Sequence, residues 1–181
     1  MKNTMELIDL IPELKEIRNE NLRAKVIKVW ENAVKQGGWT LEDLKTLPYT
    51  LLVENVDISF PEHVRVVCRL CIAMEDVLID MYGDRYAIDH DVLVAGALLA
   101  DVGKLIEFRK VNGKYEFSET YQNLRHPFTG VALSYQFGIP EEVLHVIATH
   151  SWEGDKFKRK PESIIFHHAD FTDFDLTKSA K

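Results

Sequence analysis

The sequence predicts an all-α fold, a helical bundle that carries one small β-hairpin. Three observations support this prediction. Apolar residues recur every three or four positions along most of the chain, which is the period of an amphipathic helix. Glycine and proline divide the chain into segments of helical length. Residues 107–118 alternate instead in the manner of strands, and they surround Asn112-Gly113, the strongest two-residue hairpin signal.

The first helix is expected to run from about Leu22 to the pair Gly37-Gly38, which ends it. Its apolar positions share one helix face, at Val26, Ile27, Trp30 and Val34. A short helix over residues 41–47 follows, with Thr40 as its N-cap.

Residues 48–60 look irregular, and a long helix from Pro61 to about Tyr82 comes next. Proline suits its first position, and Gly83 stops it. Asp89 fits the N-cap of another helix, whose apolar side chains lie on nearly every side, at Val92, Leu93, Ala95, Leu98 and Leu99. Because a helix that is apolar all round is buried, we expect this helix at the centre of the core.

Three more helices are predicted after the hairpin, over residues 127–137, 141–149 and 161–172. Gly138 and Pro140 separate the first two, because both residue types interrupt helices. One globular domain, with at most an appended piece, accounts for the pattern, since 181 residues suffice for a sizeable core.

Composition and charge exclude several classes of protein. Hydrophobic residues make up 46% of the chain, which argues against disorder. The net charge is −7, from 22 basic and 29 acidic residues, so no overall field attracts nucleic acid or an anionic membrane. No apolar run approaches the roughly 18 residues of a membrane span, and the N-terminus lacks the apolar core of a signal peptide. We therefore expect a cytoplasmic protein that binds neither a nucleic-acid polymer nor a membrane.

The two cysteines, Cys68 and Cys71, have C-x-x-C spacing. A redox motif would begin a helix after a strand, whereas this pair lies in the middle of a predicted helix. A zinc site would need a second pair of ligands, and none is obvious. We expect two buried thiols that act as small apolar groups.

Two aspartates lie next to apolar segments, where a carboxylate needs a partner. Asp101 follows the apolar run of residues 92–100, and Asp170 follows the apolar residues 164–166 on another predicted helix. Burying a bare carboxylate is very costly, so each must be paired, protonated or bound to a metal. For Asp101 the plain alternative is an ion pair with Lys104.

Three of the seven histidines lie at the ends of predicted helices. His63 opens the long helix, His126 precedes a proline at a helix start, and His150 closes a helix. Helical folds build divalent-metal sites from nitrogen and carboxylate ligands on separate helices. We therefore expect these histidines to gather with Asp101 and Asp170 around a metal.

In this order the residues resemble the HD-domain superfamily of metal-dependent phosphohydrolases. The family has an early histidine, a His-Asp pair, often two further histidines, and a late aspartate. The matching segments are HVRVVCRLCIAME, VAGALLADVGK, HPFTGVAL, GIPEEVLHVIATHSWEG and FHHADFTDFD. The resemblance covers roughly residues 60–175. It implies an HD-like metal-binding domain over residues 56–181, with residues 1–55 as an N-terminal helical extension packed on it.

The resemblance implies a set of metal ligands, of which this chain retains His63, Asp101, His126, His150 and Asp170. In the family a first metal takes the early histidine, the His-Asp pair and the late aspartate. A second takes the two intermediate histidines and shares the aspartate of the pair. Here Ala100 replaces the namesake histidine, and alanine offers no lone pair, so affinity at the first site should fall.

Two other histidines were considered as substitutes for this lost ligand. His90-Asp91 does not restore it, because His90 precedes Asp101 by 11 residues, about 16 Å along a helix. His167 is three residues before Asp170 and shares its helix face, so we hypothesise that it partly replaces the missing ligand. The alternatives are that His167 packs in the core or hydrogen-bonds a ligand.

Two cations are candidates for substrate binding. Lys104 matches the family's lysine beside the substrate phosphate, although a lysine at a helix C-terminus is equally expected. Arg125, next to His126, is a second candidate for an anionic substrate, and exposure to solvent is its alternative. We expect His145 at the surface or in the core, and His168 in a structural role. The tryptophans are expected to pack rather than to stack on nucleic-acid bases, and they are Trp30, Trp39 and Trp152.

The activity that the resemblance implies is metal-dependent hydrolysis of a phosphate ester, in a nucleotide or a small phosphorylated metabolite. One or two divalent ions (Mn, Fe, Ni, Co, Zn or Mg) would polarise the reacting oxygen and activate a water. Asp101 would bridge or anchor the metal and, with Lys104, carry catalysis. Two alternatives remain: an HD-type enzyme with non-phosphate chemistry (ring hydrolysis, lyase or di-iron oxygenase), or a non-catalytic relative that binds a ligand or partner. Homo-oligomers are compatible with each.

Overall fold

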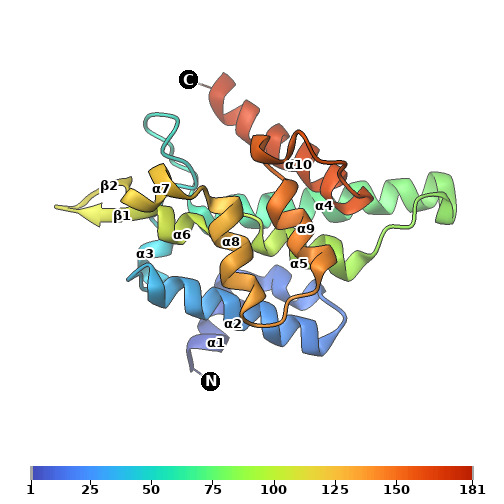
Figure 1. Ribbon diagram of the computed structural model, residues 1–181, viewed down its shortest axis with the longest axis horizontal. Helices are drawn as coiled ribbons and strands as arrows, with labels where there is room; N and C mark the ends of the chain where they lie inside the picture. The colour runs from blue at the N-terminus through green and yellow to red at the C-terminus, as the bar shows by residue number, and fades with distance from the viewer. Residues whose placement is uncertain (1, 181) are drawn as a thin grey trace.

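A computed structural model of the protein describes residues 2–180, which are helical apart from one two-stranded antiparallel hairpin (Figure 1). This confirms the predicted all-α fold. The N-terminal elements are α1 (Lys2–Leu10), the 3₁₀-helix η1 (Pro12–Glu16), α2 (Glu20–Gln36) and α3 (Leu41–Leu44). The central elements are α4 (Phe60–Tyr82), η2 (Gly83–Arg85), α5 (His90–Leu99), α6 (Lys104–Glu107), β1 (Phe108–Val111) and β2 (Lys114–Phe117). The C-terminal elements are α7 (Glu119–Asn123), α8 (His126–Tyr135), α9 (Glu141–Thr149), η3 (Trp152–Gly154) and α10 (Pro161–Ser179).

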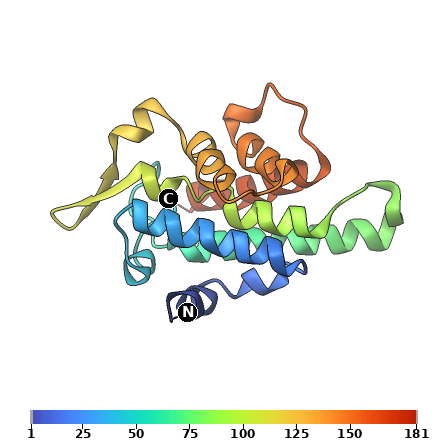
Figure 2. The same ribbon diagram turned by 60° about the horizontal axis from the view of Figure 1, so that its bottom comes forward.

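Helix α5 lies at the centre of the molecule, as its all-round apolar sequence predicts. Residues 93–100 are buried, and α5 packs against α2, α4, α9 and α10. In Figures 1 and 2, α8, α9 and α10 lie on one side of α5, while α1 and η1 lie on the other. Helix α5 therefore contacts elements from the N-terminal part of the chain and elements from the C-terminal part.

The end of α5 is arranged so that α8 begins directly beside it. The chain turns after Leu99, and α6 begins at Lys104. A Cβ atom at Gly103 would lie only 2.2 Å from the backbone oxygen of His126. Glycine thus permits a backbone approach that any larger residue would prevent, and it brings the first residue of α8 next to Asp101.

The N-terminal segment contains more helix than the sequence predicted. Helix α1 and η1 precede α2, and α2 begins at Glu20 with the side chain of Asn19 as its N-cap. The segment packs on the rest of the molecule through buried apolar residues and through two indole hydrogen bonds. Trp30 Nε1 donates to the Leu98 oxygen (2.9 Å), and Trp39 Nε1 donates to the Leu105 oxygen (2.8 Å). Both tryptophans are buried, as predicted.

Other predictions hold with small changes. The hairpin pairs Phe108 with Phe117, and its turn residues Asn112 and Gly113 both have positive φ. Cys68 and Cys71 are free and buried. Helix α7 was not predicted, and α10 continues to Ser179, beyond the expected end. Among the described residues, no helix is long and apolar enough to cross a membrane.

Candidate metal centre

All five residues that were expected to bind metal converge at one place. They come from separate elements: the first turn of α4, the residue pair after α5, the first residue of α8, the residue after α9, and the middle of α10. In chain order they are His63, Asp101, His126, His150 and Asp170. They form two groups that share Asp101. We call Asp101, His126 and His150 the histidine cluster, and His63, Asp101 and Asp170 the carboxylate cluster.

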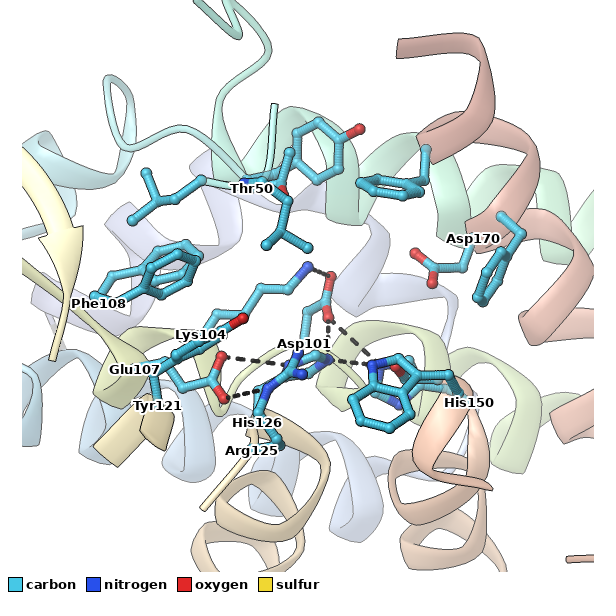
Figure 3. A pocket seen from close by; sticks show the side chains of 18 residues that line it. Thr50, Asp101, Lys104, Glu107, Phe108, Tyr121, Arg125, His126, His150 and Asp170 are labelled. Atoms are coloured by element: carbon cyan, nitrogen blue, oxygen red, sulfur yellow. Dashed lines mark hydrogen bonds and ion pairs between the residues drawn. The ribbon is translucent and has the colours of Figure 1, made fainter. Parts of the chain in front are cut away.

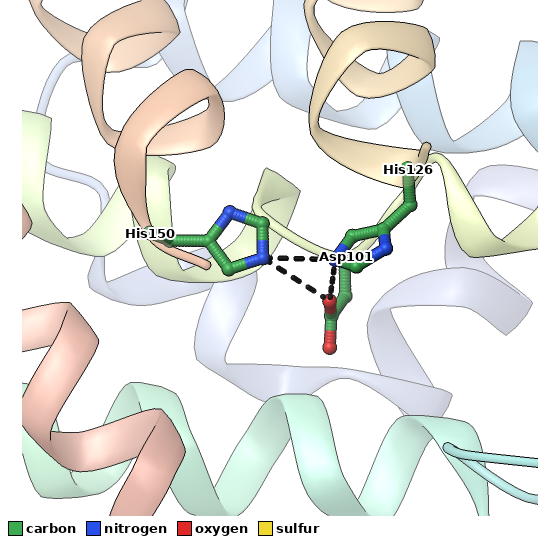
Figure 4. Close-up of side chains that lie close together, drawn as sticks. All are labelled: Asp101, His126 and His150. Atoms are coloured by element: carbon green, nitrogen blue, oxygen red, sulfur yellow. Dashed lines mark hydrogen bonds and ion pairs between the residues drawn. The ribbon is translucent and has the colours of Figure 1, made fainter. Parts of the chain in front are cut away.

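The histidine cluster brings three potential ligand atoms together in a buried position (Figure 4). The Nε2 atoms of His126 and His150 are 3.0 Å apart. The Oδ1 atom of Asp101 lies 3.4 Å from the first and 3.6 Å from the second. Ligand atoms that share a zinc-like ion at about 2.0–2.2 Å lie about 3 Å from one another. The spacing therefore fits one divalent ion.

The hydrogen bonds on the far sides of these rings explain why their Nε2 atoms are suited to a metal. His150 Nδ1 faces the Ile147 carbonyl oxygen at 2.8 Å, and a carbonyl can only accept. In the neutral ring Nδ1 therefore carries the proton, and Nε2 presents a lone pair. Burial holds the pKa of His126 well below its ordinary value, which favours the neutral ring. His126 Nδ1 faces Glu107 Oε2 at 3.4 Å, and the tautomer with its proton on that nitrogen presents the Nε2 lone pair toward His150 and Asp101. In this tautomer the three atoms would receive a shared cation.

The carboxylate cluster has a different character, because its histidine is surrounded by acceptors. His63 Nε2 lies 3.0 Å from Asp101 Oδ2 and 3.2 Å from Asp170 Oδ1. Its Nδ1 lies 2.7 Å from Asp173 Oδ2, and the Tyr49 ring stacks on it at 4.0 Å. Burial opposes the charged ring, but the hydrogen bonds to these three carboxylates raise the pKa of His63 to about 10.

Asp101 connects the two clusters and also contacts a lysine. Lys104 Nζ donates to Asp101 Oδ2 at 2.7 Å, so the ion pair considered as an alternative is present together with both clusters. Asp101 is 3% exposed. Burial would raise its pKa, but Lys104 and the neighbouring histidines hold the pKa of Asp101 well below its ordinary value. The carboxylate is therefore ionised and available to a metal.

The donor atoms of both clusters fit a divalent transition metal. Imidazole nitrogen with carboxylate oxygen is the combination that suits Mn, Fe, Co, Ni and Zn. The candidate ligand side chains are held by further hydrogen bonds, as metal-bound histidines usually are. His150 bonds a backbone carbonyl, and His63 contacts Asp173.

A pocket opens above Asp101, and its wall is largely aromatic (Figure 3). Figure 3 shows Phe108 and Asp170 on opposite sides of Asp101, with Lys104 directed toward the centre. The aromatic lining residues are Tyr49, Phe108, Phe117, Tyr121, Trp152, Phe171 and Phe174. Such a pocket suits a small molecule that has both an anionic group and an apolar or aromatic part.

Arg125 reaches this pocket, but it does so while paired with acidic groups. Its Nε lies 3.3 Å from Glu107 Oε1, and its NH1 lies 3.1 Å from Glu153 Oε1. The guanidinium is 4.8 Å from the centre of the Tyr121 ring and 5.6 Å from that of Trp152. Burial raises the pKa of Glu107 to about 7, although Arg125 opposes this rise. The arginine is thus fixed in orientation before any ligand binds.

Four histidines lie outside both clusters: His90 at the start of α5, His145, His167 and His168. His167 does not join the carboxylate cluster, because its Nδ1 hydrogen-bonds the His150 backbone oxygen at 2.6 Å. The structure thus supports the alternative in which His167 bonds a ligand residue. His145 Nε2 accepts from the Lys160 amide at 3.1 Å, and His168 is exposed.

Asp173, Tyr49 and Glu107 also border the site, although the sequence did not indicate them as site residues. Asp173 could have been found, because it follows Asp170 by three residues and so shares its helix face. Tyr49 comes from an irregular segment that no periodic pattern places. Glu107 begins the predicted hairpin by sequence but ends α6 in the structure.

The chain is similar in sequence to a curated protein, the dihydroneopterin 2′,3′-cyclic phosphate phosphodiesterase of Methanocaldococcus jannaschii. The two are 31% identical over 175 residues, which cover 91% of this chain and 67% of the relative. No family model and no solved structure matches the chain. The similarity thus extends over nine-tenths of the sequence.

Proposed function

The chain belongs to the family of the dihydroneopterin 2′,3′-cyclic phosphate phosphodiesterase and is a phosphohydrolase, and we propose that it opens the cyclic phosphodiester of a small ring-bearing molecule. The observation that carries the proposal is the histidine cluster at the base of a pocket lined by aromatic rings and two cations. The phosphate would lie over Asp101, and the organic part would contact the aromatic wall.

We assign the metal ligands of this enzyme to the same residues that the HD-domain resemblance implies. The histidine cluster and the carboxylate cluster supply them, with Ala100 in place of the namesake histidine. With this assignment the chain would be a divergent member of the HD superfamily. It is supported by the convergence of five ligand-type side chains from five separate elements.

Hydrolysis of a cyclic phosphodiester requires a water to attack phosphorus while one ring P–O bond breaks. The departing oxygen takes a proton, and the product is a phosphate monoester. A divalent ion in the histidine cluster would supply Lewis-acid polarisation of the phosphoryl group and a water of lowered pKa. The Lys104 ammonium, 2.7 Å from Asp101 and directed into the pocket, would hold a phosphate oxygen by charge. Arg125 would orient the anion from the pocket wall.

The aromatic wall is suited to a flat ring. Phe117 lies between Phe108, at 5.7 Å, and Tyr121, at 3.8 Å between ring centres. These three residues form one side of the pocket. A planar heterocycle would add to this series by stacking, which stabilises aromatic pairs by about 0.5–1.5 kcal/mol beyond area burial.

The proposal is tested by supplying purified protein with Mn, Fe(II), Co or Zn and a panel of phosphodiesters. The panel contains dihydroneopterin 2′,3′-cyclic phosphate, 2′,3′-cyclic AMP and 3′,5′-cyclic AMP. Chromatography should detect a monoester from the first two compounds. Ring opening releases no inorganic phosphate, so a phosphate assay alone would miss it. Absence of monoester with every metal would refute the proposal.

A matched pair of variants separates the site from the rest of the molecule. His126→Gln removes a member of the histidine cluster, while His168→Gln changes an exposed histidine outside it. We expect the first to lose at least 100-fold in turnover and the second to keep wild-type activity. Equal activities would show that the histidine cluster does not carry the reaction.

A further inference from the structure

The geometry points to a single divalent metal per chain, held by the histidine cluster, with the Lys104 ammonium in the position at Asp101 that a second metal would need. This inference deepens the proposed function and rests on its metal centre. In the carboxylate cluster the Lys104 ammonium would then supply the positive charge that a second metal ion supplies in a two-metal site.

The carboxylate cluster has few donor atoms left for a metal. Ala100 is fully buried immediately before Asp101 and contributes no donor atom. The carboxylate cluster therefore has three ligand-type side chains, and one of these, Asp101, also belongs to the histidine cluster. Both ring nitrogens of His63 already face carboxylates.

The two carboxylate oxygens of Asp101 face different neighbours. Oδ1 faces the nitrogens of His126 and His150. Oδ2 faces His63 at 3.0 Å and Lys104 at 2.7 Å. A metal in the carboxylate cluster would share Oδ2 with the ammonium, whereas a metal in the histidine cluster would have the other oxygen, Oδ1, available.

The Lys104 ammonium is held against Asp101 by its surroundings. Its side chain is 14% exposed, and Nζ lies 5.6 Å from the centre of the Tyr49 ring as well as against Asp101. The charge of Asp101 and the face of the Tyr49 ring both attract the ammonium to this position. A second metal at Asp101 Oδ2 would either repel the ammonium at close range or remove it from both partners.

Charge balance at the site also favours a single ion. Three carboxylates, those of Asp101, Asp170 and Asp173, lie around His63, and the Lys104 ammonium contacts Asp101. One divalent ion together with the ammonium already balances these three negative charges, before any charge on His63 is counted. A second divalent ion would leave an excess of at least two positive charges in a buried site, which is costly.

Metal stoichiometry tests this inference without any substrate. Protein is titrated with Mn²⁺ by calorimetry, and metal per chain is measured after gel filtration. We expect one Mn²⁺ per chain in the wild type. His63→Gln and His150→Gln make a matched pair, because both histidines are 1% exposed. The first should keep the ion, and the second should weaken binding at least 100-fold.

Lys104→Met tests the role of the ammonium. Removing the charge frees Asp101 Oδ2, so a second and weaker Mn²⁺ binding event should appear. Circular dichroism and thermal unfolding confirm folding, and His126→Gln replaces His150→Gln if the latter does not fold. Two ions in the wild type, none in the wild type, loss of the ion in His63→Gln, or one ion in Lys104→Met would each overturn the inference. Because no substrate is used, failure to hydrolyse a cyclic phosphate would contradict the proposed function and leave this result standing.

Discussion

The two ends of α5 carry similar residue pairs, but one pair is structural and the other belongs to the candidate metal centre. A His-Asp pair, His90-Asp91, begins the helix, and Ala100-Asp101 follows its last turn. Both aspartates are close to the same core helix. The two ends differ in the groups that the rest of the chain brings into contact with each aspartate.

At the start of α5 the partners are complete. Asp91 accepts from the backbone amides of Arg18 at 2.7 Å and Asn19 at 2.8 Å. His90 Nδ1 lies 2.6 Å from Glu75, and its Nε2 lies 3.2 Å from the Glu16 backbone oxygen. These contacts fasten the N-terminal segment to the start of α5. Each of these partners belongs to the fold itself, so the pair is structural.

At the end of α5 the side chains meet in a different way. The Nε2 atoms of His126 and His150 are 3.0 Å apart, and Asp101 Oδ1 lies 3.4 Å from the first. Three ligand-type atoms from three elements thus converge on one point, a spacing that suits one divalent ion. A His-Asp dipeptide in the sequence is therefore a poor guide to chemistry, and the convergence of ligand atoms in the structure is a better one.

The largest expected effect comes from Asp101→Asn. The amide keeps the size of the side chain but loses the charge that both clusters share. We expect turnover of a cyclic phosphodiester to fall at least 1,000-fold, about 4 kcal/mol of transition-state stabilisation. Because a buried charge is removed, the free energy of unfolding should not fall by a similar amount. The measurements are initial rates at saturating metal and urea unfolding.

A comparison with Asp170→Asn sharpens this prediction. Asp170 belongs only to the carboxylate cluster. The substitution Asp170→Asn should reduce turnover less than Asp101→Asn does, since the histidine cluster remains intact. Equal losses would mean that both clusters contribute equally to the reaction.

The sequence predicted the central helix and the convergence of ligands, for a physical reason. A helix that is apolar on every side must be buried, and a carboxylate at its end then needs a partner. This placed Asp101 at the centre of the site. The same reasoning could not reveal how Asp101 divides its two oxygens, because that depends on Lys104 and on side-chain orientation.

Other features were beyond the reach of a periodic pattern. Helix α1 is short and carries charged residues, and its buried contacts form only against the folded core. Tyr49 reaches His63 from an irregular segment, so nothing in local sequence spacing joins the two. The role of His90 was visible only after folding, since Glu75 and Glu16 come from different elements.

The second largest effect is expected for His90→Ala, and it concerns stability. Glu75 is 3% exposed, and the substitution removes its ion-pair partner. Leaving a buried carboxylate without its partner costs about 3 kcal/mol. Urea unfolding should show this loss, while the folded variant keeps its turnover. Reduced turnover at unchanged stability would show that the start of α5 takes part in the reaction.

Lys104→Gln is expected to have an intermediate effect on substrate binding. Removing the ammonium takes away a charge contact with the phosphate, so KM should rise by about 10- to 100-fold. The assay uses one equivalent of metal, so that a second ion does not replace the lysine. Lys104→Arg should recover part of the affinity, because it restores the charge with a different shape. An unchanged KM would remove Lys104 from the substrate site.

The smallest expected effect belongs to Asp91→Asn, the same substitution as Asp101→Asn at the opposite end of α5. The amide has one acceptor oxygen, so one of the two backbone bonds to Arg18 and Asn19 is lost. A single partly exposed hydrogen bond contributes about 1 kcal/mol. We expect the free energy of unfolding to fall by this amount, with metal stoichiometry and turnover unchanged. If Asp91→Asn instead reduced metal binding, the two ends of α5 would be coupled, and the division between a structural end and a chemical end would be wrong.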